Sequence, residues 1–197
     1  MDGLDGELQG LHAQGALELV ATRALEAFGP ELYGFLVHTM GNETDATEVF
    51  GELGENIWTA LPAFTFRCSV RTWLYVLARH AAARFRRSPW NRRGRRGGES
   101  QLDDVLARVR TRTEPWLRTE VKDRFRALRD ALEPDDRELL VLRVDRGLPW
   151  DDVAKIMLGR EDPSDAELRT ESNRLRKRYQ LLKNDLRHKA RVAGLVE

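Results

Sequence analysis

Residues 45–64, DATEVFGELGENIWTALPAF, and residues 69–87, SVRTWLYVLARHAAARFRR, decide the fold of this chain. In the first stretch apolar residues recur at helical spacing until Pro62, and Asp45 is a suitable N-cap. In the second stretch another apolar stripe follows Ser69, which also favours the N-cap position. The stripes are Ala46, Val49, Phe50, Leu53, Ile57 and Leu61, and then Val70, Trp73, Leu74, Leu77, Ala81 and Phe85. We therefore predict two amphipathic helices joined by a short loop.

Two further helices are expected before this pair. An apolar pattern from Leu17 to Phe28 stops at Gly29-Pro30, and a second runs from Leu32 to Met40 and stops at Gly41. Four amphipathic helices within residues 1–90 indicate a compact all-helical domain. Residues 91–114 are rich in Arg and Gly at first and read as a flexible linker, with an apolar patch at 102–109 that is suited to a short helix docking on a partner.

A second helical domain is predicted over residues 115–197. It begins with a helix from Leu117 to Leu132, followed by a short helix capped by Asp135 or Asp136 and by another at Pro149–Met157. Ser164 and Glu167 form a capping box that starts a long basic helix near Asp165. Helix, glycine turn, short helix and long basic helix is the order of a helix-turn-helix, although a plain helical bundle has a similar pattern.

Charge is strongly segregated along the chain, although the net charge is only +1. Between Arg67 and Arg96 there are ten arginines and no acid, whereas the preceding sixty-six residues hold eleven acids and one basic residue. Aromatic residues lie among the arginines, and this combination contacts phosphates and stacks on unpaired bases. The block favours a nucleic-acid surface over the alternative of a solvated basic helix face.

Several other classes of protein are disfavoured. The single cysteine, Cys68, allows no internal disulfide and fits a reducing cytosol. A lowered pKa would make Cys68 a redox sensor, but an incidental thiol is the alternative. We recognise no catalytic constellation, metal-ligand set, cofactor motif, secretory signal or membrane-spanning run. We expect a cytoplasmic protein that is not an enzyme and has no cofactor, metal or small-molecule substrate.

The two opening stretches resemble the second domain of bacterial RNA polymerase sigma factors of the extracytoplasmic-function class, in the sigma-70 family. Residues 131–157, ALEPDDRELLVLRVDRGLPWDDVAKIM, resemble the opening of the fourth domain of that class, and residues 172–182, SNRLRKRYQLL, resemble its recognition helix. Together these matches cover most of residues 15–92 and 115–190. The resemblance implies an alternative sigma factor that binds the beta and beta-prime subunits of core RNA polymerase, opens promoter DNA and is controlled by an anti-sigma factor.

The resemblance also assigns roles to particular residues. The residues that it implies for docking on core polymerase are Asp45, Glu48, Val49, Glu52 and Trp58. For Trp58, packing in the core is an equal alternative. The residues that it implies for holding the opened minus-ten element are Phe66, Arg67, Ser69, Arg71, His80, Arg84 and Arg87. The residues that it implies for binding the minus-thirty-five element are Arg169, Thr170, Ser172, Asn173, Arg174, Arg176 and Lys177. Trp73 lies on the apolar stripe and is assigned to the core.

The chain departs from the family pattern at two places. His80 stands where relatives more often have Asn, and residues 158–171, LGREDPSDAELRTE, form an insert before the recognition helix. The insert either lengthens that helix at its start or forms a loop over it, which leaves the register of base contacts open. Two other functions also remain open: a helix-turn-helix regulator that acts without polymerase, and a sigma-like protein that only sequesters a partner. The sequence names neither the target promoters nor the inducing signal.

Overall fold

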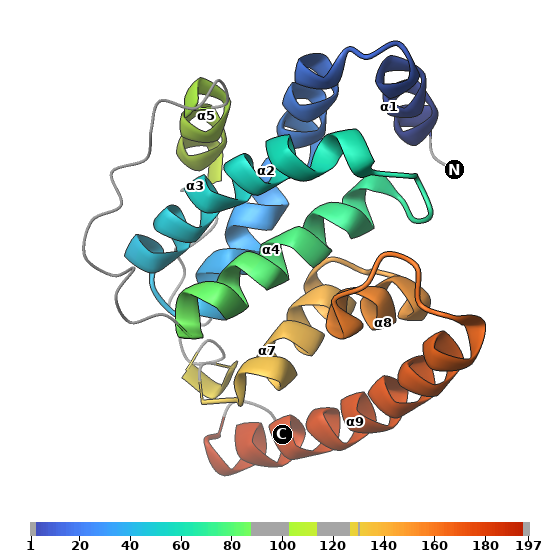
Figure 1. The fold of residues 1–197 in the computed structure, drawn as a ribbon. Helices are drawn as coiled ribbons and strands as arrows, with labels where there is room; N and C mark the ends of the chain where they lie inside the picture. Colours follow the sequence, from blue (N-terminus) through green and yellow to red (C-terminus); the bar gives the residue numbers. More distant parts are fainter. Residues whose placement is uncertain (1–2, 88–102, 114–126, 130, 195–197) are drawn as a thin grey trace.

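The computed structural model describes residues 3–87, 103–113, 127–129 and 131–194. All regular structure within these ranges is helical, which confirms the all-α class (Figure 1). The elements are α1 (Gly3–Ala13), α2 (Leu17–Met40), α3 (Glu43–Ala60), η1 (Leu61–Ala63), α4 (Val70–Arg87), α5 (Asp103–Thr113), α7 (Pro134–Leu140), the π-helical η4 (Val141–Asp145), α8 (Trp150–Leu158) and α9 (Asp165–Val192). Among the described helices, none has the length and apolar character needed to cross a membrane.

Helices α3 and α4 form where the opening stretches predicted them. Five of the six residues in the second stripe and all six in the first are buried, including Trp73 at 1% exposure. The assignment of Trp73 to the core is therefore confirmed. Ser69 caps α4, because its Oγ accepts a hydrogen bond from the Thr72 amide at 3.1 Å.

The start of α3 differs from the prediction. The N-cap is Asn42, whose Oδ1 accepts a hydrogen bond from the Asp45 amide at 2.8 Å, so Asp45 lies inside the first turn. Asn and Asp are about equally good caps, and the helix gains another turn by starting at the earlier one. The Asp45 carboxylate still favours this end of the helix, because it lies near the positive end of the helix dipole.

The predicted break at Gly29-Pro30 is wrong. α2 continues through Pro30 as one helix and ends at Gly41, which has φ +76°. Proline removes one backbone hydrogen bond, but Leu25, Leu32 and Phe35 on either side are fully buried and hold the two parts in one helix. α1, which was not predicted, packs beside α2 and buries Leu8 completely.

The carboxy-terminal helices follow the predicted order. The capping box of Ser164 and Glu167 starts α9 at Asp165, which confirms the extended helix rather than a loop up to Thr170. α7 is not capped by Asp135 or Asp136, because Pro134 occupies its first turn and Glu133 the N-cap position. Most of the predicted 117–132 helix and all of the predicted linker up to residue 102 lie outside the described residues.

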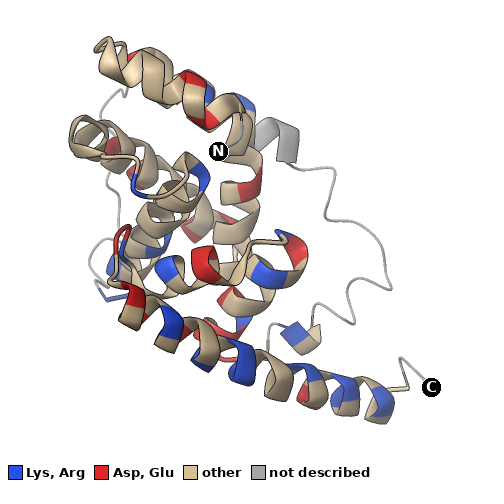
Figure 2. Cartoon of the chain, turned by 90° about the vertical axis from the view of Figure 1, so that its right-hand side faces the viewer, with Lys and Arg blue, Asp and Glu red and all other residues tan. Residues whose placement is uncertain are grey.

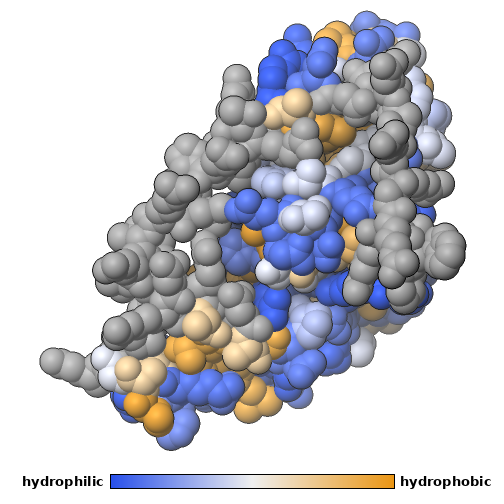
Figure 3. Space-filling view, turned by 90° about the vertical axis from the view of Figure 1, so that its left-hand side faces the viewer, coloured by the Kyte–Doolittle hydropathy of each residue, from blue (hydrophilic) through white to orange (hydrophobic). Residues whose placement is uncertain are grey.

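The helices share a continuous core. Buried apolar residues from α1–α5 and from η4, α8 and α9 belong to one cluster, and α4 lies between the α2–α3 pair and α8 (Figure 1). α5 forms where a helix was predicted, but it packs on α2 and α3 of the same chain and not on a partner, with Val109 facing Gly29 and Leu106 facing Gly54. Apolar surface also gathers at the lower end of the molecule, where α9 lies (Figure 3).

Candidate nucleic-acid interface

The outer face of α3 carries the acidic residues predicted to dock on polymerase. Asp45 and Glu48 are partly exposed, and the pKa of Glu48 is raised by burial and by the neighbouring carboxylates of Asp45 and Glu52. Trp58 is 40% exposed, so this large aromatic side chain is available to a partner. Val49 is fully buried and supports α3 from inside the core.

A pocket of about 380 Å³ lies between α3 and α4 and contains three of the predicted DNA-binding residues. It is lined by Asn56, Thr59, Ala60, Leu77, His80, Arg84 and Arg87. Arg84 joins the two helices, because its guanidinium lies 2.8 Å from Glu52 Oε1 and also donates to Asn56 Oδ1. Asn56 Nδ2 is buried and has no hydrogen-bond partner in the described structure. The pocket therefore combines cationic groups with an unused donor, a suitable set for phosphate or base oxygens.

His80 lies at the edge of this pocket against the end of α8. Its Nε2 would be 2.6 Å from a Cβ placed on Gly159, which has φ +68°. Burial lowers the pKa of His80, and the nearby Arg79, Arg84 and Arg87 lower it further. The imidazole is therefore favoured in its neutral form, in which it can accept as well as donate a hydrogen bond.

Arg71, also predicted to bind DNA, is partly buried and held by contacts within the chain. Its Nε and Nη2 donate to both carboxylate oxygens of Glu31 at 2.7 and 2.8 Å, and Nη2 also donates to the carbonyl of Arg146. The hydrogen bonds to Glu31 are the main reason that the pKa of Arg71 is raised. Arg71 thus joins α2, α4 and η4 and is not free to bind phosphate in this arrangement.

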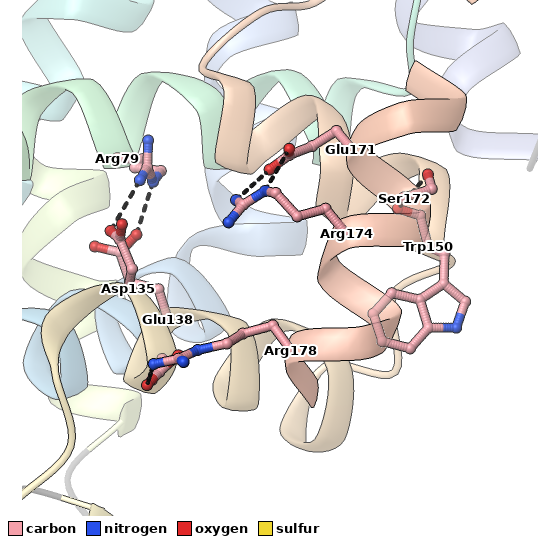
Figure 4. A network of polar contacts seen from close by, with 9 residues as sticks. Arg79, Asp135, Glu138, Trp150, Glu171, Ser172, Arg174 and Arg178 are labelled. Carbon is pink, nitrogen blue, oxygen red and sulfur yellow. Dashed lines mark hydrogen bonds and ion pairs between the residues drawn. The ribbon is translucent and has the colours of Figure 1, made fainter. Parts of the chain in front are cut away.

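Two other arginines of α4, Arg79 and Arg86, bind α7, and Figure 4 shows Arg79 beside Asp135 and Glu138. The Glu138 carboxylate is fully buried and accepts from Arg79 Nε at 2.7 Å and from Arg86 Nη2 at 3.1 Å. Arg79 also contacts the exposed Asp135. A carboxylate with no solvent contact is stable only with such partners, so these contacts fix α7 against α4.

The loop between η1 and α4 carries Phe66, Arg67, Cys68 and Ser69. Phe66 has φ +56°, and its ring packs against Phe64, which stacks on Trp73 at 4.5 Å between centroids. Arg67 is exposed and lies 3.7 Å from Asp162. Burial raises the pKa of Cys68 to about 12, which is opposite to the lowered pKa that a redox-sensing thiol requires.

Most of the residues predicted to read the minus-thirty-five element lie on the exposed side of α9, where basic residues recur along the helix (Figure 2). Arg169, Thr170, Asn173, Arg176 and Lys177 are exposed, and Arg174 is exposed but paired with Glu171. The exception is Ser172, which is 3% exposed and donates to Asp151 Oδ1 of α8. Its hydroxyl also contacts the Trp150 carbonyl of α8 (Figure 4).

Residues 24–92 match Sigma-70 region 2. The Sigma-70 region 2 segment runs from α2 to just beyond α4 and includes both the acidic face of α3 and the pocket. The match supports a sigma factor of the sigma-70 family, with a role in polymerase binding and promoter melting. None of the curated proteins compared with the chain matches it.

Sequence reasoning missed the two neutral polar residues of the pocket in the region 2 segment. Asn56 and Thr59 follow Glu52 by four and seven residues, so all three share one face of α3. Charge patterning drew attention to the arginines of α4 and left these neutral residues aside. Among the described residues, no group of three or more His, Cys, Asp or Glu side chains is placed to hold a metal ion.

Proposed function

We propose that the chain is an alternative sigma factor of the extracytoplasmic-function class that binds core RNA polymerase in the cytoplasm and opens specific promoters. The match of residues 24–92 carries the proposal, because Sigma-70 region 2 supports a role in polymerase binding and promoter melting. The partly exposed acids of α3 and the exposed Trp58 suit a charged surface with an aromatic anchor. An anti-sigma factor is the regulator expected for such a protein.

In this proposal α4 and the preceding loop hold the opened minus-ten element. Arg84 and Arg87 contact strand phosphates, and the pocket beside them receives polar groups of the unpaired strand through Asn56 and His80. Opening DNA costs stacking energy, which such contacts to the separated strand offset.

The carboxy-terminal part acts as a helix-turn-helix that contacts the minus-thirty-five element. α8 supports α9, and the exposed Arg169, Asn173 and Lys177 are near the start of α9, the part of a recognition helix that reaches base edges. The two elements are about 25 base pairs apart, or roughly 85 Å at 3.4 Å per base pair. The contacts between Glu138 and α4 therefore have to open before both halves bind one promoter.

Binding to core polymerase followed by run-off transcription tests this function. The purified chain is expected to form a one-to-one complex with core polymerase and to direct transcription from promoters selected from a randomised library. A chain that binds duplex DNA but not core polymerase would be a regulator that acts alone. A chain that binds polymerase and supports no promoter-dependent transcript would be a protein that only sequesters its partner.

A further inference from the structure

Residues 64–69, here called the opening loop, adopt a backbone that local preferences do not favour. Phe66 has φ +56°, the only positive φ of a non-glycine residue in the described part of the chain. A bulky side chain rarely adopts this conformation unless surrounding contacts hold it. The opening loop joins η1 to α4, so its shape also fixes where α4 begins.

α1 contacts the opening loop or its flanks at three points. Before the loop, His12 Nε2 donates to the Leu61 carbonyl at 2.9 Å. Within the loop, the His12 ring meets the Phe66 ring edge-on, with centroids 5.3 Å apart. After the loop, Asp5 Oδ1 accepts from the Val70 amide, the first of α4, at 3.1 Å.

The contact made by Asp5 is strong because of where it lies. Asp5 is only 7% exposed, and its carboxylate faces the positive end of the α4 dipole. Ser69 caps the Thr72 amide, so Asp5 and Ser69 together satisfy two of the first amides of α4. One of these two caps comes from a helix 65 residues earlier in the chain.

α1 is also anchored by contacts that do not involve the opening loop or α4. Leu8 is fully buried in the main core, and Glu7 pairs with Arg23 of α2. α1 is therefore a fixed support, and its polar residues Asp5 and His12 hold the loop against it. It also lies before residues 24–92, so the family match does not include it.

We propose that α1 is a brace for promoter opening, in which Asp5 and His12 are positioning residues that hold the opening loop ready to receive the unpaired minus-ten strand. This inference rests on the proposed function. It adds that the amino-terminal helix acts on the opening step and not on binding to polymerase. A preformed loop avoids the entropy cost of ordering at the moment of strand capture.

The first test measures the loop without any partner. Trypsin is expected to cleave after the exposed Arg67 faster in Asp5→Ala and His12→Ala than in the wild type, because the loop loses a fixed support. Gln9→Ala is the matched control, since Gln9 is an exposed residue of the same helix. Asp5→Asn and His12→Gln retain an acceptor and a donor, respectively, and should restore slow cleavage.

The second test measures opening with reconstituted holoenzyme. A promoter selected by the wild-type protein carries 2-aminopurine in the minus-ten strand, and its fluorescence reports strand separation. Asp5→Ala and His12→Ala should each slow opening about tenfold, as expected for losing one buried or partly buried hydrogen bond, and leave the Kd for core polymerase unchanged. Asp5→Asn, His12→Gln and Gln9→Ala should open the promoter at close to the wild-type rate.

The outcomes separate this inference from the proposed function. If the wild type neither binds core polymerase nor opens any selected promoter, the proposed function fails, and the trypsin result still decides whether α1 braces the loop. If the wild type opens promoters and both alanine variants do so equally fast, the brace is wrong. An equal loss of polymerase affinity in the alanine variants, without rescue by Asp5→Asn and His12→Gln, would also overturn it, because α1 would then serve only to fold the domain.

Discussion

Arg71, Arg84 and Arg87 lie on one helix but differ in what their guanidinium groups contact. Arg71 is held by Glu31 and by the Arg146 carbonyl, whereas Arg84 and Arg87 are exposed and line the pocket. Arg84 contacts Glu52 and Asn56 only at the surface, where an ion pair contributes little to stability. These surroundings separate Arg71, which joins parts of the fold, from Arg84 and Arg87, which we propose contact DNA.

The double variant Arg84→Ala/Arg87→Ala tests this division. It should keep its affinity for core polymerase and lower the salt slope of binding to the opened strand by about 1.4, or 0.7 for each lost phosphate contact. Arg71→Ala should instead lower the free energy of unfolding, because Glu31 loses its partner. Binding titrations at several salt concentrations, together with urea unfolding, provide the measurement. An unchanged slope in the double variant would contradict the assignment.

At Glu48, on the acidic face of α3, we expect a substitution that increases folding stability to weaken binding to core polymerase. Because burial and two neighbouring carboxylates raise its pKa, its ionised form destabilises the folded state, and stability is lost as the pH rises through the folded pKa. Glu48→Gln should therefore raise the Tm at pH 7 and have no such effect well below pH 4.5, the ordinary pKa.

The same Glu48→Gln variant should bind core polymerase more weakly, with a difference that shrinks in high salt. Glu52 is less suitable for this test because its substitution also releases Arg84. A variant that is more stable and binds polymerase equally well would show that Glu48 is not part of the docking face.

Cys68 gives a simple chemical prediction. With a pKa of about 12, its thiol stays protonated at neutral pH and is a poor nucleophile. The folded protein should react with iodoacetamide at pH 7.5 far more slowly than the protein in urea, as followed by mass spectrometry. Rapid labelling of the folded chain would contradict the burial of this thiol.

Among the elements, the contact between α4 and α7 depends on one buried carboxylate. Glu138→Gln removes the charge that Arg79 and Arg86 share, and breaking a buried ion pair costs about 3–5 kcal/mol. We expect Glu138→Gln to lower the free energy of unfolding, measured in urea, by an amount near the lower end of that range, because both arginines retain some solvent contact. Asp135→Asn is the control, since Asp135 is 73% exposed and should change stability by less than about 1 kcal/mol. Equal effects would mean that Glu138 does not fix α7.

Helices with a long apolar stripe could be predicted from the sequence, but the positions at which a helix breaks or continues could be predicted less well. The stripes of α3 and α4 repeat over four to five turns, and the capping box of α9 has both of its residues at the required spacing. Pro30 predicts a helix end, because the cost of proline inside a helix can be judged from the sequence, whereas the packing of Leu25 and Leu32 that outweighs this cost cannot.

The candidate site was predictable to a similar extent. Charge patterning identified Arg84 and Arg87, and the family resemblance placed them with His80 on a DNA-binding face. Neither source of information could show that Glu31 holds Arg71 or that Ser172 faces α8, since both depend on tertiary contacts. Asp5 and His12 were missed for the same reason, because their partners lie 65 and 49 residues away.

On the scale of the whole molecule, the two halves are packed together through the α4 surface. Arg71, Arg79 and His80 of α4 each contact the carboxy-terminal part, at Arg146, Glu138 and Gly159. The proposed function needs the two halves to reach separate promoter elements. Binding to polymerase therefore has to supply the free energy that separates α4 from α7 and α8.

Promoter opening by the reconstituted holoenzyme tests the central claim most directly. The measurement is the 2-aminopurine signal from the minus-ten strand of a selected promoter, with core polymerase alone as the reference. The signal is expected to rise only when both core polymerase and this chain are present, and Arg84→Ala/Arg87→Ala is expected to reduce it. A chain that binds core polymerase tightly and leaves the minus-ten strand paired on every selected promoter would contradict the account.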